Sequence, residues 1–244
     1  MHLMKDTIVI IPTYNEIENI ESIIKAVFSQ HKEFHVLVVD DNSPDLTALK
    51  VKELQQEYPD KLFLLKRQKK TGLGSAYIDA FKWCLEKEYG YIFEMDADFS
   101  HNPDDLIKLY NACHLDGADV AIGSRYIDGV NVVNWPMSRI LLSYFASKYV
   151  RFITRMKIED TTAGFVCYKR RVLETINLDT IEFVGYAFQI EMKFKAYLKK
   201  FKIVEVPVIF TDRKKGKSKM SGGIISEAIF GVIKMKLKSL FNRK

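Results

Sequence analysis

Cysteine is scarce in this chain. Only Cys84, Cys113 and Cys167 occur in 244 residues, and their spacing is not that of metal ligands. An odd, small number of cysteines argues against a disulfide framework and favours a reducing compartment. None has the surroundings expected of a nucleophile, so we expect three buried, unreactive thiols.

Long hydrophobic runs are also missing. The longest stretch without Lys, Arg, Asp or Glu is ten residues, from Gly129 to Ser138. A membrane-spanning helix needs about 20 largely apolar residues. The first six residues, MHLMKD, lack the apolar core of a signal peptide. The contents of 48% hydrophobic and 28% charged residues are those of a folded soluble protein. Together with the cysteine count, we expect this protein in the cytoplasm.

Acidic charge is nearly absent from the C-terminal end. Residues 213–244 contain ten Lys/Arg and one acid, a net charge of +9, whereas residues 1–212 carry 27 Lys/Arg and 30 Asp/Glu, a net charge of −3. This asymmetry indicates an anionic partner for the tail, either a membrane or a polyphosphate. The pI of about 9.0 also suggests an alternative class, a nucleic-acid-binding protein. The acidic body and the lack of interleaved aromatics in the tail weigh against nucleic acid.

Two aspartates follow an apolar run near the middle of the chain. Residues 91–95, YIFEM, have the pattern of a buried strand and lead into Asp96-Ala97-Asp98. Residues i and i+2 of an extended segment point to the same side, so Asp96 and Asp98 should converge and favour a cation. Mg²⁺ or Mn²⁺ binds such oxygen sites together with substrate phosphates. Two merely solvated surface acids are the alternative for this motif taken alone.

Strand and helix patterns alternate through the chain. Strands are expected at 7–12, 34–39, 62–65, 91–95, 118–122 and 203–210, with a short apolar stretch at 165–168. Helices are expected at about 17–27, 46–58, 76–88, from 103 onward, 139–153 and 186–199. Four strands alternating with four helices predict a mostly parallel sheet.

Two of the helix starts carry capping signals. Asn15 with Glu18 resembles a capping box, with asparagine in place of Ser/Thr. Asn102 is expected to be an N-cap and Pro103 the first helical residue, followed by two aspartates that the helix dipole favours.

Polar clusters follow three of the expected strands. They are Tyr14-Asn15-Glu16, Asp40-Asp41 and the pair Asp96 and Asp98. Ligands bind beyond the carboxyl ends of the strands in parallel sheets, so these clusters should meet at one site. That convergence favours a functional role for the aspartate pair over solvated surface acids.

The segment Gly72-Leu73-Gly74 invites comparison with a dinucleotide-binding fingerprint. Tyr77 stands where the third glycine is needed, and the segment follows the third strand rather than the first. We therefore predict glycines that allow a tight helix start or close helix packing.

Taken in order, the motifs resemble those of family 2 glycosyltransferases, and within that family the dolichol- or polyprenol-phosphate mannose synthases. The resemblance covers about residues 7–221 and rests on seven segments: 12–16 (PTYNE), 40–45 (DDNSPD), 72–74 (GLG), 96–101 (DADFSH), 123–126 (GSRY), 160–165 (DTTAGF) and 213–219 (RKKGKSK).

The resemblance implies a fold of the α/β class. This is the GT-A glycosyltransferase fold, a Rossmann-like mostly parallel sheet flanked by helices, with a C-terminal amphipathic helix. It also implies inverting, metal-dependent transfer of mannose from GDP-mannose to a polyprenyl monophosphate, giving a β-linked product. A UDP-sugar donor, or a different polyprenyl-phosphate or polysaccharide acceptor, is the alternative. A non-catalytic module with the same fold is disfavoured by intact Asp96, Asp98 and Arg125.

The resemblance also implies roles for matching residues. The metal, Mg²⁺ or Mn²⁺, is expected on Asp96, Asp98 and Ser100, although some relatives carry glutamine at the third position. The nucleotide sugar is expected on Pro12, Tyr14, Glu16, Asp40, Asp41, Asp96 and Asp98. The acceptor phosphate is expected on Ser124, Arg125 and Arg139. The catalytic residues are expected to be Asp98, Arg125, Arg213 and Lys219.

The chemistry is consistent with this set of residues. Metal and cations must stabilise the charge that develops on a departing nucleoside diphosphate. An acceptor phosphate is already an oxyanion and needs no strong base, while arginine suits phosphate because it can bind it bidentately. Arg125 could still be a surface arginine. His101 could contact ligand or pack the loop, and Glu191 could be a base or a solvated or capping acid.

We expect two parts in the chain. Residues 1–221 form the catalytic domain, and residues 222–244 form a basic amphipathic helix. Apolar residues from Ile225 to Phe241 fall largely on one helical side. This pattern indicates a helix at a membrane surface, or one packed on its own domain. A lipid substrate requires membrane contact, so we expect a peripheral protein on the cytoplasmic face. A membrane-anchoring partner protein is left open.

Overall fold

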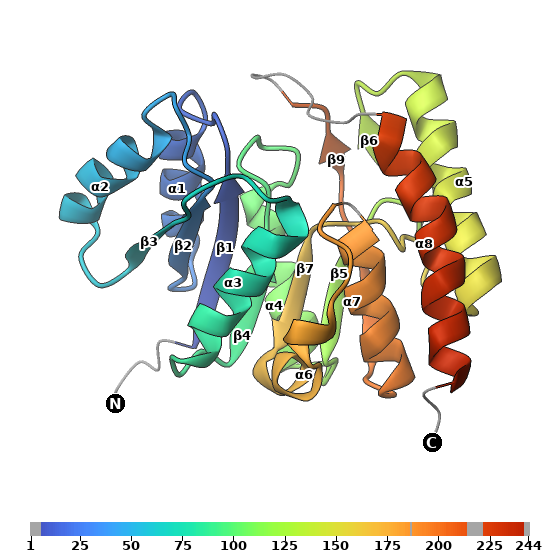
Figure 1. Ribbon diagram of the computed structural model, residues 1–244. Coiled ribbons are helices and arrows are strands. Elements are labelled where there is room, and N and C mark those ends of the chain that lie inside the picture. The colour runs from blue at the N-terminus through green and yellow to red at the C-terminus, as the bar shows by residue number, and fades with distance from the viewer. Residues whose placement is uncertain (1–5, 186, 214–221, 242–244) are drawn as a thin grey trace.

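A seven-stranded sheet organises the computed structural model, which describes residues 6–185, 187–213 and 222–241 (Figure 1). At 222–228 and 241 the backbone alone is described. The strand order is β3-β2-β1-β4-β7-β5-β8. The strands are β1 (Thr7–Thr13), β2 (His35–Asp40), β3 (Leu62–Lys66), β4 (Tyr91–Glu94), β5 (Val120–Ser124), β7 (Val166–Lys169) and β8 (Ile203–Pro207).

One strand of this sheet runs against its neighbours. β7 is antiparallel to β4 and β5, and the other pairs are parallel. Val166 pairs with Glu94 on one side and Ile122 on the other, so β7 begins at the carboxyl ends of its neighbours. Residues 160–165, just before β7, therefore lie at the edge where such sheets bind ligands. The predicted α/β class and mostly parallel sheet are confirmed.

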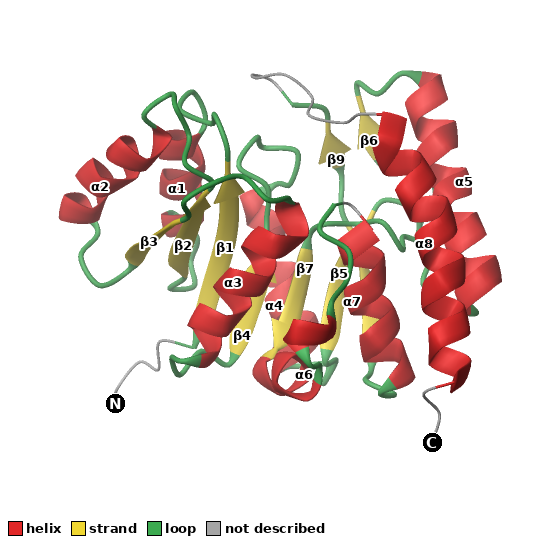
Figure 2. Ribbon diagram, in the orientation of Figure 1, coloured by secondary structure: helices red, strands yellow, loops and turns green. Residues whose placement is uncertain are grey.

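Helices cover both faces of the sheet (Figure 2). One face packs against α1 (Ile20–Phe28), α2 (Thr47–Glu57) and α4 (Leu106–His114). The other packs against α3 (Leu73–Leu85), α5 (Met137–Thr154), α6 (Arg170–Thr175), α7 (Ala187–Leu198) and α8 (Gly222–Phe241). Two short 3-10 turns, η1 (Pro103–Asp105) and η2 (Leu178–Thr180), complete the helical elements of the described residues.

The two cores explain the apolar run of β1. Ile8 and Ile10 enter the core shared with α3 and α7, and Val9 and Ile11 enter the core shared with α1 and α2. All four side chains are fully buried. A strand covered on both faces needs apolar residues at consecutive positions, and the sequence of β1 shows that pattern.

A short parallel ribbon, β6 (Val132–Val133) and β9 (Phe210–Thr211), lies beyond the carboxyl end of the sheet (Figure 1). The expected single strand at 203–210 is wrong in this respect, because β8 ends at Pro207. Proline has no N–H to continue a strand ladder. The chain then pairs with β6 instead: Asp212 N donates to Val133 O at 3.0 Å.

The capping box expected at Asn15 is wrong. Asn15 has a left-handed backbone with φ of 57°, and α1 begins only at Ile20. The Asn15 N–H, which the Glu18 side chain would accept in a capping box, donates instead to Ser43 Oγ at 3.0 Å. The next N–H, that of Glu16, donates to Thr47 Oγ1 at the start of α2, at 3.1 Å. A tertiary contact has replaced the local one.

The other cap signal is confirmed. The Asn102 side chain accepts the Asp104 N–H at 3.1 Å, and Pro103 begins η1. The three cysteines are buried free thiols, as expected.

The C-terminal helix α8 packs on the body of the protein beside α5 and α7 (Figure 1). Val232 and Met235 are buried in the core, whereas Phe230, Leu237 and Leu240 are exposed. Of the helices in the described ranges, none has the length and apolarity to cross a bilayer. The predicted boundary at residue 221 lies outside the described residues, so the domain division stays a prediction.

The Gly72-Leu73-Gly74 segment starts α3 tightly, as predicted. Gly72 has φ of +113°, which favours glycine. Gly74 N donates to Val184 O at 2.8 Å. A Cβ on Gly74 would lie 2.7 Å from both the Phe183 carbonyl oxygen and the Phe188 Cβ. At Gly74, α3 therefore lies so close to α7 and to residues 183–184 before it that no side chain would fit.

Gly74→Ala should therefore lower the free energy of unfolding by about 1–3 kcal/mol, the usual effect of overpacking a core. Urea denaturation measures this change. Gly90→Ala is the control, because its Cβ would meet only Asp6 O, at 3.7 Å. Equal stability of the two variants would contradict the close packing at Gly74.

Candidate active site

A mostly apolar cavity of about 450 Å³ opens beyond the carboxyl ends of β4 and β5. Its polar part is lined by Asp96, Asp98, Ser100, His101, Arg125, Arg139, Thr162, Gly164, Gln189, Asp212 and Arg213. Its apolar wall includes Leu142, Phe145, Ala146, Tyr149 and Ile229, which come from α5 and α8. The cavity thus has two chemically different ends.

The predicted aspartate pair lies at the polar end. Asp96 and Asp98 follow β4 directly, and both line the cavity. Asp98 Oδ1 accepts the Ser100 N–H at 3.1 Å, and Oδ2 lies 3.1 Å from Arg213 Nη2. Phe99 between them has a left-handed backbone with φ of 60°, which turns the loop back on itself. All three predicted metal ligands, Asp96, Asp98 and Ser100, line the cavity.

The side chains at this end suit a divalent cation. Ser100 Oγ is buried and has no hydrogen-bond partner among the described residues, so it is available as a ligand. Two carboxylates and a hydroxyl are the oxygen ligands that Mg²⁺ and Mn²⁺ prefer. Within the described ranges no cluster of three or more His, Cys, Asp or Glu side chains could hold a metal. Oxygens of a bound ligand would have to complete the coordination.

His101 supports this loop from inside. Its ring stacks on Phe165 with centroids 4.9 Å apart, and its Nδ1 accepts the Asp96 N–H at 3.1 Å. Burial lowers the pKa of His101 to about 4, although Asp98 opposes the shift. The ring is therefore neutral at pH 7, and the hydrogen bond to Nδ1 places its proton on Nε2. His101 both packs the loop and lines the cavity.

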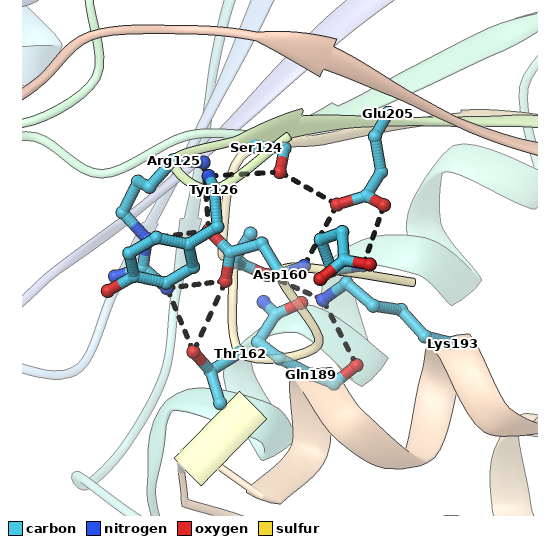
Figure 3. Close-up of polar contacts among 10 residues, drawn as sticks. Ser124, Arg125, Tyr126, Asp160, Thr162, Gln189, Lys193 and Glu205 are labelled. Carbon is cyan, nitrogen blue, oxygen red and sulfur yellow. Dashed lines mark hydrogen bonds and ion pairs between the residues drawn. The ribbon is translucent and has the colours of Figure 1, made fainter. Parts of the chain in front are cut away.

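Arg125 lines the cavity and is held there by a buried ion pair (Figure 3). We call this side of the cavity, formed by Arg125 and Thr162, its floor. Its Nε donates to Asp160 Oδ2 and its Nη2 to Asp160 Oδ1, both at 2.6 Å, and Nη2 also donates to Thr162 Oγ1 at 2.8 Å. Burial alone would raise the pKa of Asp160, but the Arg125 guanidinium lowers it below its usual value. Arg125 is therefore a buried, charged residue and not a surface arginine.

A second carboxylate holds Asp160 in place. Glu205 accepts the backbone N–H groups of Glu159 and Asp160 at 2.7 and 2.9 Å. It also accepts the Ser124 hydroxyl at 2.7 Å (Figure 3). Ser124 is fully buried and does not line the cavity. The structure thus places this predicted phosphate contact behind the site, where it braces the Arg125 support.

Two more charged residues close to this site, Lys193 and Glu94, are fully buried. Lys193 Nζ donates to Ala163 O at 2.5 Å and to Gln189 O at 3.2 Å, which ties the 160–164 loop to α7 (Figure 3). Burial lowers the pKa of Lys193 to about 8, although Glu94 opposes the shift. Burial raises the pKa of Glu94 to about 8, with Lys193 and then the Gln189 amide opposing.

Two further predicted arginines line the cavity. Arg139 Nη1 lies 2.7 Å from Asp212 Oδ1, and its guanidinium lies 3.9 Å from the Trp135 ring centroid. Arg213 follows β9 and pairs with Asp98. Each of the two is partly exposed at the cavity. Lys219, the remaining predicted cation, lies outside the described residues.

Two of the predicted nucleotide-sugar contacts, Asp96 and Asp98, line this cavity. The other five lie at or just after the carboxyl ends of β1 and β2, outside its lining: Pro12, Tyr14, Glu16, Asp40 and Asp41. Asp40 accepts hydrogen bonds from Thr13 Oγ1 and from the Ser43 backbone, both at 3.0 Å. Lys70 Nζ lies 4.3 Å from the Tyr14 ring centroid. The structure therefore places these residues at the same sheet edge as the cavity.

Arg67 is a member of this region that sequence reasoning missed. Its Nη1 lies 2.6 Å from Asp41, and its Nε lies 2.9 Å from Asp79. Burial raises the pKa of Asp41 in spite of this partner. Arg67 could have been identified from its position directly after β3, at the same edge as the other polar clusters.

Glu191 is not part of the cavity. Its Oε2 accepts the backbone N–H groups of Glu182 and Phe183 at 2.9 and 3.1 Å, and its Oε1 lies 3.1 Å from Lys195 Nζ. It is neither a solvated nor a helix-capping acid but clamps a loop onto α7. Gln189, two residues earlier on α7, does line the cavity and was not among the predicted residues.

Comparison with known proteins agrees with the fold. The sequence model of the protein family described as Glycosyl transferase family 2 matches residues 8–176 of this chain. The crystal structure of glucosyl-3-phosphoglycerate synthase from Mycobacterium tuberculosis, with Mn²⁺, UDP and glucosyl-3-phosphoglycerate, superposes with a TM-score of 0.68. It covers 96% of this chain and 80% of that chain at 14% identity, which shows a shared fold.

The sheet, its helices and this match define a glycosyltransferase of the GT-A fold, as the resemblance implied. The chain belongs to glycosyltransferase family 2.

Three relatives from that family are much more similar in sequence. Polyprenol monophosphomannose synthase of Mycolicibacterium smegmatis is 46% identical over 97% of this chain and 89% of that protein. Undecaprenyl-phosphate mannosyltransferase of Micrococcus luteus is 44% identical over 91% of this chain and 90% of that protein. Dolichol-phosphate mannosyltransferase of Pyrococcus furiosus is 40% identical over 90% of this chain and 60% of that longer protein.

The Arg125–Asp160 pair yields a stability prediction. Arg125→Met should lower the free energy of unfolding by about 3–5 kcal/mol, because it leaves the buried Asp160 carboxylate without its counterion. Arg139→Met is the matched control, since Arg139 is about one third exposed and such pairs contribute about 0–1 kcal/mol. Chemical denaturation of both variants measures the difference.

A double variant separates the lost pair from lost packing. Arg125→Met with Asp160→Asn should be less destabilised than Arg125→Met alone, because the stranded charge is removed as well. Equal losses for Arg125→Met and Arg139→Met would show that the buried pair does not support the floor.

Proposed function

We propose that this enzyme transfers mannose from GDP-mannose to a polyprenyl monophosphate, with inversion and with dependence on Mg²⁺ or Mn²⁺. The supporting observation is that one cavity joins an end suited to phosphates and a cation to a wall suited to a lipid. The three relatives at 40–46% identity, named for polyprenol, undecaprenyl and dolichol phosphate mannosyl transfer, support the same substrates.

The apolar wall supports the lipid acceptor. Leu142, Phe145 and Ala146 of α5 and Ile229 of α8 line the cavity beside its polar end. Leu142 and Phe145 also reach the surface, where they are 47% and 62% exposed. An isoprenyl chain could therefore lie along this wall and continue out of the cavity toward a membrane, while its phosphate stays at the polar end.

The polar end supports the group transfer. Asp96, Asp98 and Ser100 would hold the divalent cation, which would supply positive charge to the diphosphate leaving group. Arg213 and Arg139 would bind phosphate oxygens, as arginine does bidentately. In the reaction the bond from the sugar C1 to the diphosphate breaks and a bond from C1 to an acceptor phosphate oxygen forms. That oxygen is already ionised, so no side chain has to remove a proton.

The donor nucleotide would lie at the carboxyl ends of β1 and β2, beside Tyr14, Glu16, Asp40 and Asp41. A UDP-sugar donor or a different acceptor remains the alternative. A lipid acceptor places the enzyme at a membrane surface, and we propose the cytoplasmic face. The exposed apolar residues of α5 and α8, including Phe145, Phe152 and Phe230, support peripheral contact. A membrane-anchoring partner protein stays a prediction.

Asp98→Asn should lower metal-dependent mannose transfer by about 100-fold or more, because it removes a carboxylate from the group that stabilises leaving-group charge. The assay measures label moved from GDP-mannose to polyprenyl phosphate at saturating Mn²⁺. Asp104→Asn, at an exposed aspartate six residues further on, is the control and should keep full activity. Full activity in Asp98→Asn would rule out the metal assignment.

Phe145→Asp should raise the KM for a long-chain polyprenyl phosphate by about 10–100-fold, which corresponds to losing the burial of one aromatic side chain. The KM for a short-chain prenyl phosphate and the affinity for GDP should change little. Leu115→Asp, at an exposed leucine remote from the cavity, is the control. Unchanged kinetics with the long-chain acceptor would place the lipid elsewhere.

A further inference from the structure

Gln189 stands out among the residues that line the cavity. Its side chain is 2% exposed, yet neither Oε1 nor Nε2 has a hydrogen-bond partner among the described residues. Native proteins leave few buried side-chain amides in this state. An amide that is buried, lines a cavity and is unpaired is suited to a polar group of a bound ligand.

The space in front of Gln189 is kept open by a glycine. A Cβ built on Gly164 would lie 3.9 Å from Gln189 Nε2 and 3.9 Å from His101 Cε1. Gly164 therefore lies between the amide and the imidazole ring and contributes no side chain of its own. All three residues line the same cavity. The gap between them is the room that a small polar ligand group would use.

The groups behind this gap hold it in a fixed shape. Lys193 donates to Ala163 O and to Gln189 O, so one buried cation ties the backbone next to Gly164 to the backbone of Gln189. Glu94 is also buried near the Gln189 amide, but its two carboxylate oxygens have no partner in hydrogen-bond geometry within the described residues. The amide therefore lies close enough to Glu94 to lower the pKa of that carboxyl, but it makes no hydrogen bond of normal geometry with it.

The location of the gap limits which ligand group can enter it. Asp96 and Asp98 are proposed to face the diphosphate of the donor, and the transferred sugar is bonded directly to that diphosphate. The sugar must therefore lie next to the aspartates, and the gap over Gly164 is adjacent to them: His101, which forms one side of the gap, accepts the Asp96 N–H. An amide with both a donor and an acceptor matches a hydroxyl group, which has both as well.

We propose that Gln189 and the open space over Gly164 form the subsite for the transferred sugar, and that the Gln189 amide recognises one of its hydroxyl groups. This inference rests on the proposed function, because it takes the ligand to be a nucleotide-linked mannose. Sites that hydrogen-bond a substrate hydroxyl discriminate strongly against analogues that lack it, because a buried polar group is then left unpaired.

The test compares the wild type with Gln189→Met, which keeps the shape of the side chain and removes both polar atoms. The donors are GDP-mannose and its 2-, 3-, 4- and 6-deoxy forms, assayed with polyprenyl phosphate and Mn²⁺. Gln189→Met should lower kcat/KM for GDP-mannose by about 10–100-fold, as expected for one lost hydrogen bond and the group it leaves unpaired. The affinity for GDP, measured by calorimetry, should not change.

The deoxy donors identify the contact itself. One of them should be a poor donor for the wild type by a similar factor, and that penalty should vanish in Gln189→Met, because the lost hydroxyl and the lost amide belong to one interaction. Gln56→Met, at an exposed glutamine of α2, should behave as wild type. Gly164→Ala should fold normally, since its methyl meets only contacts of 3.9 Å, and should lower transfer without changing GDP affinity.

Thermal unfolding separates this role from a structural one. Gln189→Met should be as stable as wild type or more stable, because it removes buried polar atoms that have no partner. A lower Tm, with an equal loss of transfer from every donor, would show that Gln189 supports Glu94 instead and would overturn the inference. Unchanged kcat/KM in Gln189→Met would also overturn it. A wild type that transfers no mannose from GDP-mannose would overturn the proposed function, and the inference with it.

Discussion

The buried ion pair between Arg125 and Asp160 is the interaction on which the site depends. A guanidinium and a carboxylate that are both withdrawn from water require close geometry, and here both contacts are 2.6 Å. Glu205 fixes the backbone of Asp160, and Lys193 fixes the loop that follows it. The cavity floor is therefore set before any ligand binds, which is what preorganised electrostatic catalysis requires.

The topology of the sheet makes this arrangement attainable. In an all-parallel sheet, the loop before a strand lies at the amino edge, away from the site. Because β7 runs antiparallel between β4 and β5, the loop before it arrives at the carboxyl edge instead. Asp160, Thr162 and Gly164 thus come to lie beside the aspartates that follow β4. A single reversed strand brings the loop with the anchoring carboxylate to the proposed metal site.

Much of the fold could be predicted because buried parallel strands leave continuous apolar runs, as β1 does. The reversal of β7 could not, since a four-residue apolar strand has the same pattern in either direction. The capping box at Asn15 failed because a side chain of a distant loop, Ser43, accepts the Asn15 N–H. The aspartate pair was predictable from its position after β4. Gln189 was not, because a glutamine on a helix gives no sign in the sequence that it is buried and unpaired.

Because one cavity has both a polar and an apolar end, we infer that a phosphate-bearing lipid and a sugar diphosphate meet there. The most direct test is transfer of radiolabelled mannose from GDP-mannose to polyprenyl phosphate by the wild-type protein in detergent, with and without Mg²⁺ or Mn²⁺. The account predicts label in the lipid phase only when the cation is present. Absence of lipid-bound label with the cation, under conditions where a UDP-sugar is transferred, would contradict it.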